Sequence, residues 1–191
     1  MAKKKIGVLA LQGDFEAHQK ALLRAGAEPV EVRSAVDLQN IDGLVIPGGE
    51  SSTMLKLLEI EDLLEPLREF GRRRSIFGTC AGAILLATDV SNPSQASLGL
   101  MDIGVERNAY GRQIESRIAR LKPDGIEGDL EAVFIRAPII RRVGEKVKVL
   151  ARYQGDPVLV EQGRHLVATF HPELTDDPRI HRLFLEKVIS S

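Results

Sequence analysis

The chain has 191 residues, of which 26 are basic and 27 are acidic, and its formal net charge is −1. A charge this close to zero gives no electrostatic reason to expect nucleic acid or an anionic membrane as a partner. No stretch approaches the roughly 18 uninterrupted apolar residues of a membrane span, and the opening MAKKKIGVLALQGD is too soon charged for a secretory signal. We therefore expect a cytoplasmic protein with a single domain over residues 1–191, because this length supports one sizeable core.

The first half of the chain alternates apolar strands with helical segments. Strands are predicted at residues 4–11, 29–34, 43–49 and 75–79. A helix follows the first strand up to a stop signal at Gly26, a second covers residues 51–74 with Pro66 dividing it in two, and a third covers residues 81–88. Apolar strands that alternate with helices predict an α/β fold with a mostly parallel sheet covered on both faces.

The second half is rich in strands. Residues 99–121, 130–140 and 147–170 have strand character, and Gly163 lies in a predicted hairpin turn. Residues 177–190 close the chain as a helix with one apolar side. No repeat or low-complexity linker divides the sequence.

The single cysteine, Cys80, lies between a predicted strand and a predicted helix. It cannot form an internal disulfide, and the four histidines offer no zinc-like spacing with it, so it is either a packed small hydrophobe or a nucleophile. Gly78 and Gly82 flank it at minus two and plus two, as in a nucleophile elbow with cysteine in place of serine. Such a turn strains the central residue and places its sulfur at a helix N-terminus, which favours the thiolate.

A nucleophilic thiolate needs a base and a group that orients the base. His171 follows an apolar strand and Glu173 comes two residues later, so in an extended segment both side chains point the same way. Of the other histidines, His18 and His181 lie in predicted helices and His165 lies in the hairpin. The elbow and the His-x-Glu pair together favour a catalytic interpretation.

An oxyanion hole is the remaining requirement of acyl chemistry. The amide of Ala81 is one donor by elbow geometry. The amides of Gly48 and Gly49 end the preceding parallel strand and can turn toward the same sheet edge, although glycines there also serve ordinary turns. The sequence GGESS lacks the lysine of a phosphate-binding P-loop, which argues against a nucleotide site.

Three motifs in this order, PGGES, GTCAG and HPE, resemble the signatures of the class I, or triad-type, glutamine amidotransferases. The longer segments GVLALQGDFEAH, GLVIPGGESSTM, FGTCAGAILLA, LGLMDIGVERNAYGRQ, FIRAP and ATFHPELTDD are similar, nearly end to end, to the glutaminase subunits of two-component pyridoxal 5'-phosphate synthases. The resemblance implies a flavodoxin-like open sheet and no metal or organic cofactor.

The resemblance also implies a reaction, the hydrolysis of L-glutamine to L-glutamate and ammonia. It assigns catalysis to Cys80, His171 and Glu173 through a glutamyl thioester, and the oxyanion hole to the amides of Gly49 and Ala81. The residues that it assigns to binding glutamine are Gly48, Gly49, Glu50, Arg107, Ile135 and Arg136. An arginine can pair bidentately with the substrate carboxylate, but the sequence does not decide between Arg107 and Arg136.

By the same resemblance, the ammonia passes to a barrel-shaped synthase subunit within a large hetero-oligomer. Two other functions stay open at the level of sequence. One is a different cysteine hydrolase on a related sheet, such as a peptidase or a deglycase, which glutamine turnover without proteolysis would exclude. The other is a non-catalytic regulatory subunit of the same fold, for which loss of the Cys80 thiol would have no effect.

Overall fold

The computed structural model describes residues 3–109 and 116–190. The strands of its largest sheet are β1 (Lys5–Leu9), β2 (Glu28–Val32), β3 (Gly43–Ile46), β4 (Ser75–Thr79), β10 (Lys148–Tyr153), β11 (Asp156–Gln162) and β12 (His165–Ala168). Within the described residues these seven strands lie in the order β10-β11-β12-β4-β3-β1-β2. The five strands from β12 to β2 are parallel, and β11 and β10 extend one edge as antiparallel strands. The predicted mostly parallel sheet is confirmed.

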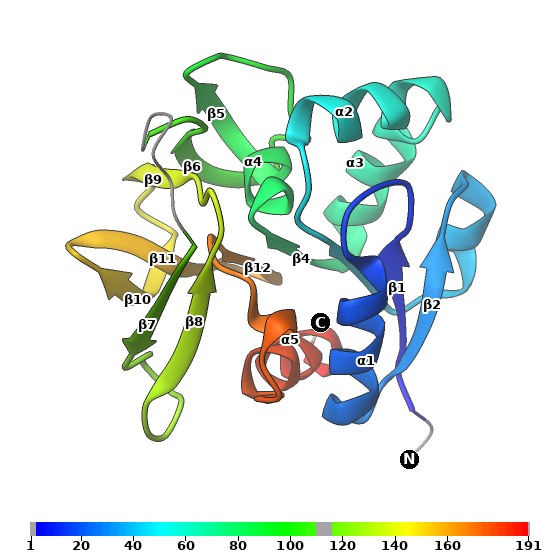
Figure 1. Ribbon diagram of the computed structural model, residues 1–191. Helices are drawn as coiled ribbons and strands as arrows, with labels where there is room; N and C mark the ends of the chain where they lie inside the picture. Colours follow the sequence, from blue (N-terminus) through cyan, green and yellow to red (C-terminus); the bar gives the residue numbers. More distant parts are fainter. Residues whose placement is uncertain (1–2, 110–115, 191) are drawn as a thin grey trace.

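Helices cover both faces of this sheet (Figure 1). They are α1 (Phe15–Ala25), α2 (Ser51–Ile60), α3 (Leu64–Arg73), α4 (Ala81–Leu86) and α5 (Arg179–Ile189), with the short 3-10 helices η1 (Ala35–Asn40) and η2 (Pro172–Leu174). Side chains alternate along β3, so that Leu44 and Ile46 enter the apolar cluster under α2, α3 and α4, whereas Val45 enters the cluster under α1 and α5. No helix in the described part of the chain is both long and apolar enough to cross a membrane.

Two smaller sheets account for the strand-rich second half. One contains β5 (Ala87–Ser91), β6 (Met101–Glu106) and β9 (Ile139–Val143), and the other pairs β7 (Arg117–Leu121) with β8 (Leu130–Phe134). Figure 1 shows β7 and β8 as a two-stranded ribbon set apart from α2 and α3. Gly163 has a φ of 55° in the turn between β11 and β12, so the predicted hairpin is present.

Of three local predictions, two need correction or refinement and one is confirmed. Residues 87 and 88, expected in a helix, belong to β5 because α4 ends at Leu86. The helical segment after β3 does divide in two, but the break precedes Pro66, which lies in the first turn of α3 where its missing amide proton costs nothing. Helix α1 ends at Gly26 as predicted, with a left-handed φ of 97° that glycine adopts freely.

The sheet order brings three segments of interest together. Strands β3, β4 and β12 are parallel neighbours, so their carboxyl ends share one edge of the sheet. The glycine turn follows β3, Cys80 follows β4, and His171 lies shortly after β12. This edge is where open parallel sheets form their binding sites.

Candidate active site

The turn that carries Cys80 has the strained backbone that its flanking glycines predict. Cys80 has a φ of 49° and a ψ of −104°, a conformation that a residue with a side chain rarely adopts. A Cβ on Gly78 would lie 2.5 Å from the carbonyl oxygen of Gly82, and a Cβ on Gly82 would lie 2.2 Å from that of Ile46. Both glycines are therefore required by close backbone approach, and the elbow packs directly against β3.

Backbone contacts hold Cys80 in this position. Its N–H donates to the carbonyl oxygen of Ala168 at the end of β12, at 3.0 Å. Its Sγ lies 3.9 Å from the carbonyl oxygen of Ile135, and the residue as a whole is 7% exposed. Ala81 is the first residue of α4, and the first amide of a helix has no acceptor within that helix. The Ala81 N–H is thus available to an oxygen atom beside the sulfur.

His171 and Glu173 are paired, although not by the geometry that the sequence suggested. His171 Nδ1 lies 2.7 Å from Glu173 Oε1, and the two side chains are 12% and 1% exposed. The segment is not extended, because Pro172 to Leu174 form the 3-10 helix η2 with His171 at its N-cap. The expectation of an extended segment is wrong, and it is the tight turn that brings residues i and i+2 together. The His171 N–H donates to the carbonyl oxygen of Val133 in β8, which fixes the start of the turn.

The electrostatics of this pair favour an ionised carboxylate beside a basic imidazole. Burial alone would raise the pKa of the Glu173 carboxyl, but the imidazoles of His18 and His171 hold it below its usual value. Burial alone would lower the pKa of the His171 imidazole, but Cys80 and Glu173 raise it well above 6.5. His171 Nε2 is buried and has no hydrogen-bond partner among the described residues, which leaves it available to a reacting group.

The glycine turn after β3 closes the opposite side of the site. A Cβ on Gly48 would lie 2.6 Å from His171 Cε1 and 3.3 Å from Cys80 Cβ, so this position must lack a side chain. Gly49 has a φ of 148°, which also favours glycine. A Cβ on Gly13, in the loop after β1, would lie 1.8 Å from the Gly48 carbonyl oxygen. The site is therefore assembled around backbone segments in direct contact.

A cavity of about 290 Å³ lies at this edge of the sheet. The described residues that line it are Gly13, Asp14, Gly48, Gly49, Cys80, Ile135, Arg136, His171, Glu173 and Leu174. Seven of the residues predicted from sequence are thus brought together here. Ala81, Glu50 and Arg107 are not among the described lining residues.

Glu50 and Arg107 pair with each other beside this cavity. Arg107 lies 3.3 Å from Glu50 Oε1 and donates to Ser52 Oγ at 2.5 Å. The Glu50 carboxylate also caps α2 by accepting from the N–H groups of Ser52 and Thr53. Burial alone would raise the pKa of the Glu50 carboxyl, but the hydrogen bonds from Thr53 and Ser52 lower it. Residues 110–113 of the motif that begins at Arg107 lie outside the described residues.

Arg136 differs from Arg107 in its surroundings. It has a left-handed φ of 44°, is exposed, borders the cavity and has no side-chain partner among the described residues. Ile135 beside it is 37% exposed. This short segment follows β8, so the two-stranded ribbon positions one rim of the cavity.

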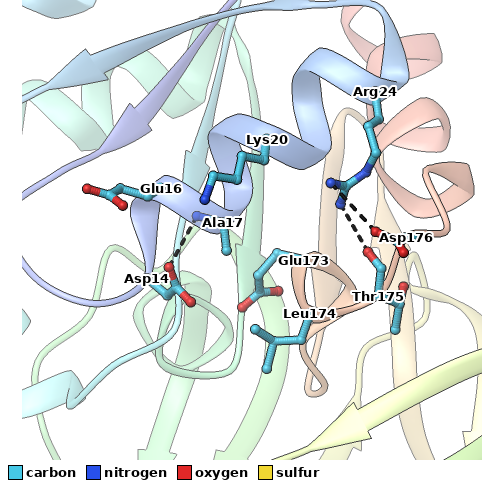
Figure 2. A pocket seen from close by; sticks show the side chains of 9 residues that line it. All are labelled: Asp14, Glu16, Ala17, Lys20, Arg24, Glu173, Leu174, Thr175 and Asp176. Atoms are coloured by element: carbon cyan, nitrogen blue, oxygen red, sulfur yellow. Dashed lines mark hydrogen bonds and ion pairs between the residues drawn. The ribbon is translucent and has the colours of Figure 1, made fainter.

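Sequence reasoning missed the residues behind Glu173. His18 Nε2 lies 3.4 Å from Glu173 Oε2, and His18 Nδ1 lies 3.0 Å from His181 Nε2. Figure 2 shows Glu173 facing α1 across a second cavity of about 260 Å³. Arg24 of α1 spans it by donating to the carbonyl oxygen of Thr175 at 3.0 Å. The positions of His18 and His181 in helices gave the correct secondary structure but no sign of this contact, because residues far apart in the chain make it.

The fold and this geometry together define a class of protein, an α/β protein with a cysteine, a histidine and a glutamate at the carboxyl edge of its sheet. The profile of the SNO glutamine amidotransferase family matches residues 8–190, and the chain belongs to this family.

Two curated relatives and one solved structure extend this result. The chain is 64% identical to pyridoxal 5'-phosphate synthase subunit PdxT of Solibacter usitatus, over 97% of this chain and 100% of the relative. It is 58% identical to the subunit of the same name from Koribacter versatilis, over 96% of this chain and 95% of the relative. It also superposes on a crystal structure described as a glutamine amidotransferase, with a TM-score of 0.90 and 49% identity, over 96% of this chain and 98% of the other.

Proposed function

We propose that this chain is the glutaminase subunit of a pyridoxal 5'-phosphate synthase, and that it hydrolyses L-glutamine through a glutamyl thioester on Cys80. The observation that carries the proposal is the strained Cys80 in one cavity with the paired His171 and Glu173. Membership in a glutamine amidotransferase family supports the choice of glutamine as the substrate. The whole of residues 1–191 would act as one glutaminase domain.

The first half of the reaction forms the thioester. The Cys80 thiolate attacks the side-chain amide carbon of glutamine, a carbon–sulfur bond forms, and the carbonyl electrons move onto oxygen. The amides of Gly49 and Ala81 would donate to this oxyanion. As the tetrahedral intermediate collapses, the carbon–nitrogen bond breaks and protonated His171 gives its proton to the nitrogen. Ammonia leaves, and the glutamyl group stays on sulfur.

The second half hydrolyses the thioester. Neutral His171 takes a proton from water while the oxygen of that water bonds to the thioester carbon, and the carbon–sulfur bond then breaks. Glutamate leaves and the Cys80 thiolate is restored beside protonated His171. Glu173 orients the imidazole throughout, because its contact with Nδ1 leaves Nε2 directed at the reacting atoms.

Recognition of glutamine requires partners for its α-carboxylate and its ammonium group. Arg136 is better placed than Arg107 for the carboxylate, because it borders the cavity and is not already paired with an acid. Arg107 would instead hold Glu50 and the start of α2 in place. Ile135 supplies an apolar contact at the rim, and Gly48 and Gly49 allow the substrate to approach the backbone.

The ammonia would pass to the synthase subunit, which we propose is barrel-shaped and part of a large hetero-oligomer with this chain. Ammonia that escapes into neutral water becomes protonated and loses its nucleophilic lone pair, so direct transfer protects it. The relatives at 64% and 58% identity carry the name of a synthase subunit, which supports such a partner. The reducing cytoplasm suits a protein whose nucleophile is a free thiol.

The experiment that tests delivery of ammonia uses the chain assembled with its synthase subunit. We expect Cys80→Ala to abolish glutamine-dependent formation of pyridoxal phosphate and to leave formation from added ammonium salts intact. Loss of both activities in a correctly assembled complex would overturn the ammonia-donor role. Full glutamine-dependent activity in the variant would support a regulatory subunit.

A further inference from the structure

The buried carboxylate of Glu173 has two oxygens, and only one is explained by the triad. Oε1 lies against His171, whereas Oε2 is buried and makes no hydrogen bond of ordinary geometry to any described residue. His18 Nε2 lies 3.4 Å from this oxygen. An ionised carboxylate that is 1% exposed is costly unless donors face both of its oxygens.

We propose that His18, oriented by His181, is a positioning residue for the Glu173 carboxylate, and that it thereby keeps the His171 imidazole aligned for catalysis. The proposal rests on the proposed glutaminase function of the same site. His18 lies in the first turn of α1 and His181 near the start of α5, and both residues are 0% exposed. The two histidines thus come from helices at opposite ends of the chain, which lie side by side (Figure 1).

Contacts around His18 select one arrangement of its ring protons. His18 Nε2 lies 3.0 Å from Thr79 Oγ1 as well as 3.4 Å from Glu173 Oε2, and His18 Nδ1 lies 3.0 Å from His181 Nε2. A lone pair on Nε2 would face the negative charge of Glu173, so the proton belongs on Nε2. His18 Nδ1 then accepts from His181 Nε2–H, and the unpartnered His181 Nδ1 carries no proton.

The same ring also touches the strand that leads to the nucleophile. Thr79 is the last residue of β4 and immediately precedes Cys80. A single donor on His18 therefore lies between the residue before the nucleophile and the acid that orients the base. Phe77 packs its ring edge-on against His181, with ring centroids 5.7 Å apart, and likewise against His18 at 6.4 Å. These contacts restrict rotation of both imidazoles.

Several charged or titratable groups act on His18. They are Glu173 and His171 from the turn after β12, Asp14 at the start of α1 and His181 from α5. Burial lowers the pKa of His18, and it lowers the pKa of His181 to about 3, with the neighbouring His18 adding to the decrease. Both rings are consequently neutral near pH 7, as the proton arrangement requires.

The test compares two substitutions of similar size at His18. His18→Leu removes the donor, whereas His18→Gln keeps an N–H near the position of Nε2. We expect kcat for glutamine hydrolysis, measured with the synthase subunit present, to fall about 10- to 100-fold in His18→Leu. His18→Gln should recover most of this loss. KM should change less than about twofold in both, because His18 is not among the described residues that line the cavity.

His165 offers a matched control. It is also a buried histidine, and it accepts from the backbone N–H of Ile76 at 3.2 Å. Within the described part of the chain, no hydrogen bond or ion pair joins it to the triad. His165→Gln should leave kcat at the wild-type value. His165→Leu should likewise keep the wild-type kcat. A loss of kcat in His165→Leu equal to that in His18→Leu would overturn the proposal, because it would indicate a general effect of removing a buried histidine.

A second readout does not depend on glutamine. Cys80 is the chain's single cysteine, so the rate of alkylation by iodoacetamide reports on its thiolate alone. If His18 holds Glu173 in place, then loss of the donor weakens the charged His171 that stabilises the thiolate. The midpoint of the alkylation rate against pH should then rise by about one pH unit in His18→Leu. A wild-type alkylation profile in folded His18→Leu would overturn the proposal.

The alkylation profile also separates this proposal from the proposed function. If the assembled wild-type enzyme hydrolysed no glutamine, the proposed function would fail, yet the profile would still show whether His18 acts on the triad. If His18→Leu does not fold, His181→Leu compared with His18→Gln takes its place. His181→Leu should shift the alkylation midpoint upward while His18→Gln does not, and identical midpoints in the two variants would overturn the proposal.

Discussion

The two sides of the cavity are built in different ways. On the side of Cys80, the proposed nucleophile, the shape comes from the backbone: Cys80 is strained, and Gly78 and Gly82 allow main-chain atoms to approach each other closely. On the side of His171, the proposed base, the shape comes from side chains: His171 contacts Glu173, and His18 lies behind that carboxylate.

This difference determines how each side should respond to mutation. A backbone-built site fails as a unit, because a single added methyl group moves the strand, the turn and the helix together. In a chain of contacting side chains, each member acts on the reaction through the next one. Substitution of a member should therefore reduce activity less, the further that member lies from the reacting atoms.

The largest effect is expected at the base itself. His171→Asn should lower glutamate release by at least about 10³-fold, because His171 is the described lining residue to which we assign both protonation of the leaving nitrogen and activation of water. The measurement is steady-state glutamate release by the assembled enzyme, with His165→Gln as the control. A rate within tenfold of wild type would mean that another residue acts as the base.

A smaller effect is expected one step further from the chemistry. Glu173→Ala should lower kcat by about 10²-fold and leave KM largely unchanged, because orientation contributes less than proton transfer. The assay is the same, with Glu173→Gln run beside it to separate charge from shape. An unchanged rate in Glu173→Ala would remove Glu173 from the triad.

Gly82→Ala tests the backbone-built side. Alanine is intrinsically favoured over glycine in a helix by about 1 kcal/mol, yet here the added Cβ would lie 2.2 Å from the Ile46 carbonyl oxygen. We therefore expect a net decrease of about 1–3 kcal/mol in the free energy of unfolding, together with loss of activity.

The control for this substitution is Gly104→Ala, whose Cβ would meet a side-chain atom of Arg142 at 3.2 Å. Urea denaturation of both variants gives the comparison. A Gly82→Ala protein as stable and active as wild type would show that the elbow tolerates expansion, and that the close approach to β3 does not control the position of Cys80.

The last prediction concerns stability against pH, with no direct effect on the reaction. Burial lowers the pKa of His18, His165 and His181, to about 4 for His165, so the unfolded chain binds more protons than the folded chain below pH 6.5. Stability should therefore fall as the pH decreases from about 6.5 toward 4. His165→Gln should reduce this slope by about 1.4 kcal/mol per pH unit.

His171→Asn is the opposite case for the same measurement. The pKa of the His171 imidazole is raised in the folded wild-type chain. The contribution of His171 to the free energy of unfolding is therefore fully present below pH 6.5 and is lost only at higher pH. Protonation of the His171 imidazole itself therefore adds nothing to the slope between pH 6.5 and 4. Urea denaturation at several pH values measures both slopes, and equal slopes for His165→Gln and wild type would contradict the burial argument.

The contrast between the two sides also explains what the sequence could predict. The alternation of strands and helices and the spacing of Gly78, Cys80 and Gly82 are local signals, so the parallel sheet and the elbow followed from them. The conformation around His171 was predicted wrongly, because an i, i+2 pair fits both a strand and a tight turn. The contacts of His18 and His181 join residues 163 positions apart, and no local pattern records them.

The pairing of Arg107 with Glu50 has the same origin. Both residues carry the charges that substrate recognition needs, and the sequence does not show that these charges are placed against each other. The packing of the segment after β6 against the start of α2 pairs Arg107 with Glu50. Arg136 instead borders the cavity without an acidic partner among the described residues.

The central claim is that glutamine is hydrolysed through a thioester on Cys80. The most direct measurement is an acid quench of the assembled enzyme during turnover of isotopically labelled L-glutamine, followed by mass spectrometry of the peptide that contains Cys80. The account predicts a labelled glutamyl group on this peptide, and neither label nor glutamate release in Cys80→Ala. Glutamate release by Cys80→Ala at the wild-type rate would contradict it.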